Sequence, residues 1–213
     1  MNKYNYLGNI EKRKITTHED FKWIVVSFCI WIFWACSSSP QQNSHENKYQ
    51  KEVDYYSQII SINPGNIEAY RKRSENYFYL KRYNEALKDL NIAIELSPLS
   101  DDLFAKRVHI YSLLGLNQDA LRDANRAIEL NPKDAVNNFN RGMIYYYMEL
   151  YEEALNDINQ AILINKNYSI FFKGRGNIYK KLAENTDNEN MGDMYRQKSE
   201  SDFAMVETMS SER

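Results

Sequence analysis

The chain has 213 residues, of which 43% are hydrophobic and 26% charged, and its formal net charge is -2. This near-neutral balance does not indicate nucleic-acid binding, and two cysteines cannot build a disulfide framework. The small numbers of glycines (7) and prolines (4) favour a helical protein. One segment differs from the rest, because all 3 tryptophans lie within positions 23–34.

That N-terminal segment has the pattern of an export signal. Residues 23–35 read WIVVSFCIWIFWA, carry no formal charge and follow a basic stretch at positions 12–22. The run is shorter than the roughly 20 apolar residues that a membrane-spanning helix needs. A basic flank before a short apolar run is typical of a secretory signal peptide. We therefore predict that residues 1–35 are a signal peptide.

The end of this run resembles the lipobox of bacterial lipoproteins, in which a small residue precedes an acylated cysteine. Ala35 and Cys36 match that motif. The resemblance implies cleavage before Cys36, lipidation of Cys36, and a bacterial cell-envelope protein held by a membrane anchor. The outer membrane is preferred because Ser37 is not acidic. The alternatives are an uncleaved, single-pass signal anchor with the remainder outside the cytoplasm, and ordinary cleavage without lipid.

A polar segment follows. Residues 37–48 read SSSPQQNSHENK and include no apolar residue. Such a stretch buries too little surface to offset the entropy lost on ordering. We predict a flexible tether over residues 36–48.

From residue 49 onward the sequence repeats every 34 positions. Three of the four prolines, Pro64, Pro98 and Pro132, are spaced at this interval. Within each copy the apolar residues recur three and four positions apart, first over one stretch and then over a second that ends near the proline. This spacing predicts two helices per copy. The columns that share the period are Arg73, Arg107, Arg141 and Arg175; Tyr77, Tyr111, Tyr145 and Tyr179; Ala86, Ala120 and Ala154; Asp89, Asp123 and Asp157; Asn91, Asn125 and Asn159; and Ala93, Ala127 and Ala161.

The pattern resembles the tetratricopeptide repeat, a helix–turn–helix unit of this length. Tyr70, Arg73, Tyr77, Ala86 and Pro98 match its signature in the first copy. The resemblance implies an all-α solenoid, a right-handed superhelix of about nine helices, with terminal helices as caps. Its parts are a half-repeat at 49–66, repeats at 67–100, 101–134 and 135–168, a divergent repeat at 169–206, and a tail at 207–213.

The fourth copy departs from this pattern at residues 184–190, which read ENTDNEN. If Ser199 and Phe203 occupy the places of the alanine and the apolar residue of the second helix, about 11 residues are inserted relative to Ala154. We predict a helix near 191–206.

The repeated polar columns have two interpretations. The arginines could form a ladder of cations for a ligand, or each could lie along the stack and pair with Asp89, Asp123 or Asp157. We favour the structural interpretation, and we expect the tyrosine column to belong to the core.

By resemblance to the family, a ligand would lie in the concave groove lined by the first helix of each copy. Aromatic residues and methionine on such a face suit an extended or helical peptide. The alternative is that several of these aromatic side chains only pack against adjacent helices. The candidate groove residues are Arg71, Phe78, Tyr79, His109, Phe139, Met143, Tyr146, Tyr147, Lys173, Asn177 and Lys180, with Glu75, Ala105, Ser112, Leu113 and Lys181 beside them.

Catalysis finds little support. Of the three histidines, His18 lies in the predicted signal and His45 in the predicted tether, so only His109 lies in the array. We expect neither a metal site nor a histidine-based triad. The glycines at 174 and 176 lack the strand that a dinucleotide motif requires, so no cofactor is expected.

The sequence thus predicts a scaffold rather than an enzyme: an envelope-anchored repeat protein that binds a protein or peptide partner and no nucleic acid. Two alternatives are a structural homo-oligomer built by stacking of arrays, and a module that binds cell-wall polysaccharide through its aromatic residues.

Overall fold

The computed structural model describes residues 40–211, and the predicted signal peptide and Cys36 lie outside this range. The described residues form nine helices and no strand. Tyr49–Arg213 is one compact unit, and Met1–Lys48 is another, of which only residues 40–48 are described. Among residues 40–211 no helix combines the length and hydrophobicity of a membrane span.

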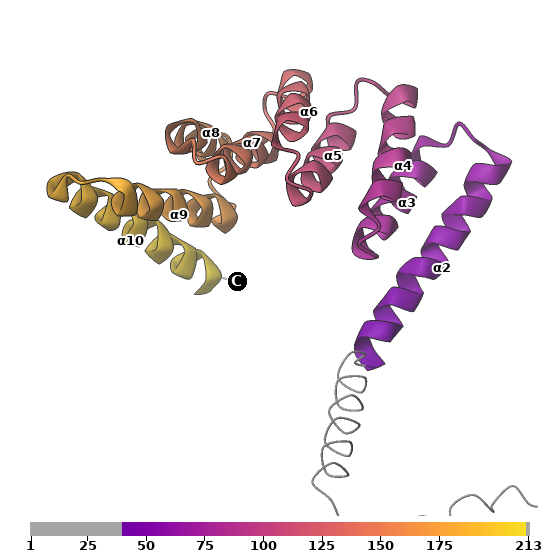
Figure 1. Ribbon diagram of the computed structural model, residues 1–213, viewed down its shortest axis with the longest axis horizontal. Coiled ribbons are helices and arrows are strands. Elements are labelled where there is room, and N and C mark those ends of the chain that lie inside the picture. The colour runs from indigo at the N-terminus through magenta and orange to yellow at the C-terminus, as the bar shows by residue number, and fades with distance from the viewer. Residues whose placement is uncertain (1–39, 212–213) are drawn as a thin grey trace, which may run out of the picture. The chain divides into compact units, whose positions relative to one another are not determined.

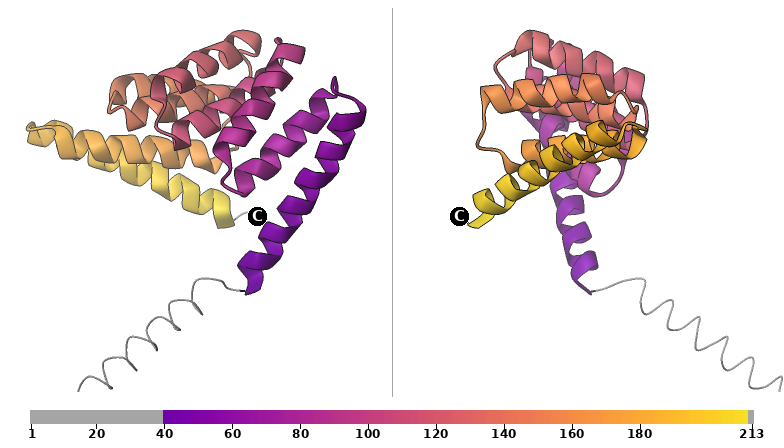
Figure 2. Two further views of the ribbon diagram at one scale, coloured as in Figure 1. Left: turned by 45° about the vertical axis from the view of Figure 1, so that its right-hand side comes forward. Right: turned by 90° about the vertical axis from the view of Figure 1, so that its left-hand side faces the viewer.

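Eight of the helices pair into four hairpins that lie side by side along the array (Figures 1 and 2). The all-α solenoid predicted from the repeat is confirmed. The first helix of each hairpin begins at residue 67, 101, 135 or 169, so the period of 34 is also the period of the structure. The helices are α2 (Pro40–Ile62), α3 (Ile67–Tyr79), α4 (Tyr83–Leu96), α5 (Asp101–Leu113), α6 (Asn117–Leu130), α7 (Ala135–Tyr147), α8 (Tyr151–Ile164), α9 (Ser169–Asn185) and α10 (Glu189–Ser211).

The turns inside the first three hairpins share one backbone conformation. Lys81, Gly115 and Glu149 have φ values of 58°, 70° and 63°, at equivalent positions of the repeat. This left-handed region is cheap only for glycine. Lys81 and Glu149 therefore show that the turn geometry is imposed by the packing of the two helices.

Alanines form the centre of each hairpin. Ala86, Ala93, Ala120, Ala154 and Ala161 are fully buried. Small side chains let the paired helices approach closely, and larger residues such as Leu90, Ile158 and Phe171 fill the space around them. The tyrosine column lies at the edge of this core, half-buried.

The arginine column joins the hairpins to one another. Arg141 donates two hydrogen bonds to the carboxylate of Asp157, at 2.7 Å each, and a third to the side-chain oxygen of Asn125 in the preceding hairpin, at 2.8 Å. Arg107 and Arg175 bridge to Asn91 and Asn159 in the same way. The structural interpretation of this column is confirmed.

The first member of this ladder uses a different acceptor. Arg73 binds Asp89 and donates to the hydroxyl of Ser57, which occupies the asparagine position in α2. The half-repeat is therefore linked to the first full repeat by the same kind of contact.

The fourth hairpin contains the predicted insertion. Arg175 pairs with Asp202, 27 residues away, whereas Arg141 and Asp157 are 16 residues apart. The difference equals the insertion of about 11 residues. Ser199 donates a hydrogen bond to the carbonyl of Gly176 at 2.9 Å, and Phe203 lies against the same glycine, so both occupy the predicted positions.

The predicted tether needs correction. Residues 40–48 are helical and continue into the half-repeat, so that α2 extends over 23 residues. Proline is favourable at the first position of a helix, and no glycine or proline interrupts residues 41–62. A stretch without apolar residues can therefore be an extension of a helix whose later turns are packed.

Candidate functional site

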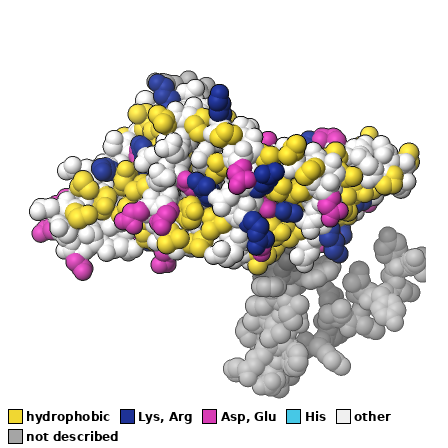
Figure 3. Space-filling model, turned by 90° about the horizontal axis from the view of Figure 1, so that it is seen from above, with side chains coloured by type: hydrophobic (Ala, Val, Ile, Leu, Met, Phe, Trp, Pro, Cys, Tyr) yellow, Lys and Arg dark blue, Asp and Glu magenta, His cyan; other side chains and the backbone are white. Residues whose placement is uncertain are grey.

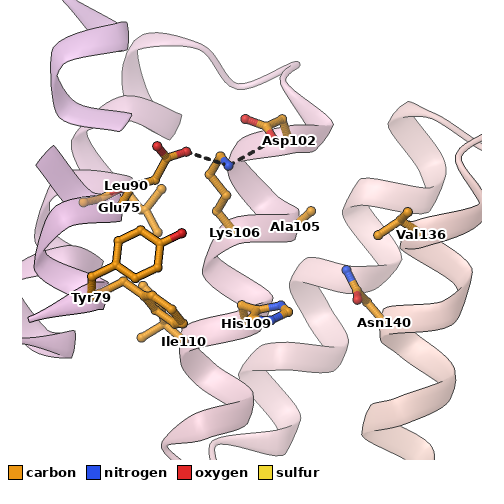
Figure 4. Close-up of a pocket in the computed structure, with 12 residues that line it drawn as sticks. Glu75, Tyr79, Leu90, Asp102, Ala105, Lys106, His109, Ile110, Val136 and Asn140 are labelled. Atoms are coloured by element: carbon orange, nitrogen blue, oxygen red, sulfur yellow. Dashed lines mark ion pairs between the residues drawn. The ribbon is translucent and has the colours of Figure 1, made fainter. Parts of the chain in front are cut away.

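The first helices of three successive hairpins enclose a pocket of about 370 Å³. Side chains from α3, α5 and α7 line it, and one residue of α4 reaches it from behind (Figure 4). The lining comprises Ser74, Glu75, Phe78, Tyr79, Leu90, Asp102, Ala105, Lys106, His109, Ile110, Val136 and Asn140. The groove predicted along the first helices is thus hollowed at its N-terminal half.

The floor of this pocket is apolar. Leu90 and Ile110 belong to the buried core between α3, α4 and α5, and Phe78 packs against that core. Ala105, with its short side chain, leaves space between α3 and α7 (Figure 4). Burial of an aliphatic or aromatic side chain here would remove its apolar surface from water.

The charged wall of the pocket is neutralised within itself. Lys106 lies between two carboxylates, 2.9 Å from Glu75 and 3.5 Å from Asp102 (Figure 4). Arg71 reaches Glu75 at 2.8 Å and also pairs with Glu68. Burial raises the pKa of Glu75, but the hydrogen bond from Lys106 and the neighbouring cations outweigh it, so that the pKa is lowered overall. The carboxylate therefore stays ionised and holds α3 to α5.

A line of exposed apolar side chains follows the other end of these helices. Tyr79, Leu113 and Tyr147 occupy equivalent positions in the last turns of α3, α5 and α7, and their exposed fractions are 58%, 56% and 66%. Tyr79 also stacks on Tyr49 of α2, with ring centroids 4.7 Å apart. These three residues in register form an exposed apolar track, whose first member, Tyr79, also lines the pocket.

The middle of the predicted groove is more densely packed. Phe139, Met143 and Tyr146 are half-buried against the core between α7, α8 and α9. The ring of Phe139 lies 5.0 Å from that of Phe171, and Gly174 provides the space for it. For these three residues the structure favours the alternative of packing between helices.

The C-terminal part of the predicted groove is cationic. Lys173 and Lys180 of α9 are exposed, and Asn177 between them is half-buried. Lys181 pairs with Glu184 of its own helix at 2.7 Å. Of the predicted groove residues, Phe78, Tyr79 and His109 are therefore brought together at the pocket, while Lys173, Asn177 and Lys180 share another helix.

Seven pocket residues were not predicted as groove residues: Ser74, Leu90, Asp102, Lys106, Ile110, Val136 and Asn140. Four of them, Asp102, Lys106, Val136 and Asn140, lie three residues before predicted positions on α5 and α7. Asp102, Lys106 and His109 are four and three residues apart and so share one face of a helix. Asp102 and Val136 lie one turn before the predicted face begins, whereas Lys106 and Asn140 lie beside it, so a wider face would have included all four.

Among residues 46–211, whose side chains the structure describes, no group of three or more histidine, cysteine, aspartate or glutamate side chains could hold a metal ion. Basic and acidic side chains stand next to each other over much of the face shown in Figure 3, with hydrophobic side chains between them.

Comparisons with known proteins agree with this architecture. A tetratricopeptide-repeat family model matches residues 135–168. The crystal structure of MamA superposes with a TM-score of 0.64 at 17% sequence identity, over 80% of this chain and 98% of MamA. YrrB, described as a TPR protein with an unusual peptide-binding site, gives a TM-score of 0.60 at 20% identity, over 78% of this chain and 85% of YrrB.

A third solved structure contains a ligand. The first TPR of Spaghetti (RPAP3), bound to the HSP90 peptide SRMEEVD, gives a TM-score of 0.53 at 22% identity, over 55% of this chain and 93% of its own. No curated protein sequence matches the chain. The repeat period, the helical hairpins and these structural neighbours together show that the chain has the tetratricopeptide-repeat fold.

Proposed function

We propose that this protein is a scaffold that binds a segment of another protein in the groove formed by α3, α5 and α7. The observation that carries the proposal is the apolar pocket between these helices, continued by the exposed track of Tyr79, Leu113 and Tyr147. A rigid concave face of this kind gives a peptide a large contact area at a low entropy cost.

The groove also suggests which contacts would bind the ligand. An apolar side chain would enter the pocket, because its charged wall is already paired. Asn140 and His109 would supply hydrogen bonds to the peptide backbone at the rim of the pocket. YrrB and the first TPR of Spaghetti are described as peptide-binding or peptide-bound, which supports a ligand of this class.

Site-specific photo-crosslinking in cells would test the proposal. A photoreactive phenylalanine analogue replaces Tyr147 in the groove, or Arg122 on α6, in the full chain. The side chain of Arg122 is 75% exposed, and Tyr147 is 66% exposed. A crosslink that formed only because the position is exposed would therefore form at position 122 as well. We expect a discrete crosslinked partner from position 147 and none from position 122.

A substitution that fills the pocket would test whether the pocket itself binds the partner. Ala105→Gln places a longer polar side chain in the space between α3 and α7, and it should abolish the crosslink from position 147 while thermal unfolding stays unchanged. A crosslink that survives Ala105→Gln, or that forms equally at position 122, would rule out the groove.

We further propose that the N-terminal segment places the array in the bacterial cell envelope, through a lipid on Cys36. The basic flank, the apolar run at 23–35 and the Ala35-Cys36 pair support this. Cleavage before Cys36 removes all 3 tryptophans. Mass spectrometry of the membrane fraction should therefore detect an acylated Cys36 at the N-terminus, and Cys36→Ala should leave an unprocessed chain.

A further inference from the structure

The edge of the array where α8 connects to α9 carries a group of exposed apolar side chains. We define this junction patch as Val136, Leu163, Ile164, Tyr168 and Ile170. All five side chains are substantially exposed, Leu163 to 79%. Val136, Ile164 and Tyr168 line one depression of about 350 Å³ together with Lys133.

The internal repeat shows that the patch is a departure from the chain's own pattern. Ile170 and Val136 stand where earlier repeats have Glu68 and Asp102. Leu163 stands where they have Glu95 and Glu129. The first turns of α7 and α9 and the last turn of α8 thus carry aliphatic residues where earlier repeats carry acidic ones.

Tyr168 replaces a helix cap. The equivalent Asn66 accepts a hydrogen bond from the backbone of Ala69, and Asp134 accepts one from Val136. Tyr168 makes no such bond to α9. Its ring lies against Phe171, with centroids 5.1 Å apart, and remains partly exposed. Ser100, the equivalent residue of the second repeat, makes no capping bond either, so the aromatic ring rather than the missing bond distinguishes Tyr168.

Lysines accompany the apolar residues. Lys166 occupies the place of Pro64, Pro98 and Pro132, and Lys133 that of Gly65 and Leu99. Both are exposed. Glu129 pairs with Arg126 at 3.0 Å, and Asp134, which caps α7, lies in the same depression as Lys133. Two lysines and one aspartate therefore border the apolar residues.

We infer that the junction patch docks on an anionic lipid surface. Aliphatic side chains that can enter the acyl boundary, a tyrosine at headgroup depth and lysines facing anionic headgroups are the components of an interfacial membrane contact. An acidic protein could match the lysines, but the combination of a large exposed leucine with an amphipathic tyrosine favours lipid.

Apart from Val136, which also lines the pocket, this contact uses other residues than the groove, and it uses the proposed membrane anchor only as a source of high local concentration. A patch of five side chains binds weakly by itself. Held near a bilayer by the N-terminal segment, it would orient the array with its α8–α9 edge toward the membrane.

Hydrogen–deuterium exchange of the full chain in vesicles tests the inference. One set of vesicles is phosphatidylcholine, and the other contains equal amounts of phosphatidylcholine and phosphatidylglycerol. We expect amide exchange in residues 162–171 to slow at least about fivefold in the anionic vesicles, while residues 113–117 at the opposite edge stay unchanged. Each lysine contributes about fivefold to binding at low salt, so Lys133→Gln with Lys166→Gln should remove most of the protection.

The matched variant takes its residues from the second repeat of the same chain. Tyr168→Ser with Ile170→Asp restores the residue types of Ser100 and Asp102, which this fold accepts. It should abolish the protection, whereas Leu116→Gln, which removes an exposed apolar side chain between α5 and α6, should not. Flotation of the vesicles reports the N-terminal anchor separately and should be the same for all variants.

Two results would overturn the inference. The first is equal exchange in both kinds of vesicle, whether or not the chain floats with them. The second is protection that appears without lipid and grows with protein concentration, which would assign the patch to contact between copies or with another protein.

Discussion

Single residues of the arginine ladder connect each hairpin to the one that precedes it. The carboxylate of Asp157 is 2% exposed, and Arg141 neutralises it through a two-point contact. The hydrogen bond with Asp157 raises the pKa of the Arg141 guanidinium, which therefore stays charged. Each arginine thereby stabilises one hairpin and its junction with the preceding one.

We predict that Arg141→Ala lowers the free energy of unfolding by about 3 kcal/mol, because it leaves a buried carboxylate without its partner. Chemical denaturation measures this. Arg122→Ala, which removes an exposed ion pair with Asp119, should cost less than about 1 kcal/mol. In the double variant Arg141→Ala with Asp157→Ala, the loss should be smaller than the sum of the two single losses. Additive losses would show that the pair is not coupled.

The pocket predicts a pH dependence of stability. The folded-state pKa of Glu75 is lowered below the ordinary value of 4.5. A carboxylate with a depressed pKa contributes stability above its unfolded-state pKa, and the contribution is lost as the pH falls through the folded-state value. The side chain is partly exposed, so the effect is less than about 1 kcal/mol.

We therefore expect the stability of the wild-type protein to fall more steeply below about pH 4.5 than that of Glu75→Gln. Above that pH the variant should be the less stable of the two, because Lys106 loses its charged partner on α3. Thermal unfolding at a series of pH values measures both. Parallel curves for the two proteins would contradict the role assigned to Glu75.

At the level of elements, the first and second helices of each hairpin meet at equivalent positions of the repeat, but the pair of residues in contact there differs from one hairpin to the next. The backbone of Gly142 approaches α8 so closely that a Cβ atom would lie 2.9 Å from Ile158. In the second repeat the equivalent residues are Val108 and Ala124, which share one buried cluster. The small residue thus lies on the first helix of one hairpin and on the second helix of the other.

This complementarity can be tested by placing the residue pair of the second repeat at the equivalent positions of the third. Gly142→Val should lower the free energy of unfolding by about 1–3 kcal/mol through overpacking. Ile158→Ala should cost about 2–5 kcal/mol through the cavity it leaves. The double variant reproduces the pair of the second repeat, so its loss should be smaller than that of either single variant. Denaturant unfolding of all three decides this, and a double variant as unstable as the sum of the two would refute the complementarity.

The sequence predicted the elements well wherever the period was intact. The proline spacing and the alanine and arginine columns predict the hairpins. Each column makes the same kind of contact in every copy, so its residue type recurs with the period of the structure. The start of α2 was missed, since a polar extension of a helix has the composition of a tether. The partner of Arg175 was also missed, although placing Ser199 in the alanine column puts Asp202 three positions later, where Asp157 follows Ala154.

Prediction of the site was less complete, for a physical reason. On a first helix, groove positions and packing positions carry the same types of residue. Only the neighbouring helix determines which of these side chains are covered. Tyr147 and Tyr146 are adjacent in sequence, yet the first is exposed and the second packs against the core. Lys106 and Asn140 were missed because their column also contains Lys72 and Gly174, and so has no common chemistry.

At the level of the whole molecule, the question is whether arrays stack end to end through α10. Inside the array, Leu155 and Ile162 of α8 pack against the core that includes Phe171 and Ile178 of the next hairpin. Asn159 supplies the acceptor for the next arginine. The corresponding residues of α10 are Glu200, Glu207 and Ala204, and all three are exposed.

A further hairpin docked on α10 would therefore bury two carboxylates and would find no acceptor for its arginine. We predict that the described face of α10 does not self-associate, so that sedimentation velocity shows no concentration-dependent species that depends on this helix. Glu200→Leu, Ala204→Asn and Glu207→Ile together rebuild the internal surface, and this triple variant should associate as concentration rises, because it exposes an apolar face. The control is Glu200→Gln with Glu207→Gln, which removes both charges without adding apolar surface and should sediment like the wild type. If the wild-type protein already associates and these substitutions in α10 do not change its sedimentation, copies meet through a different surface, and the polar face of α10 does not control assembly.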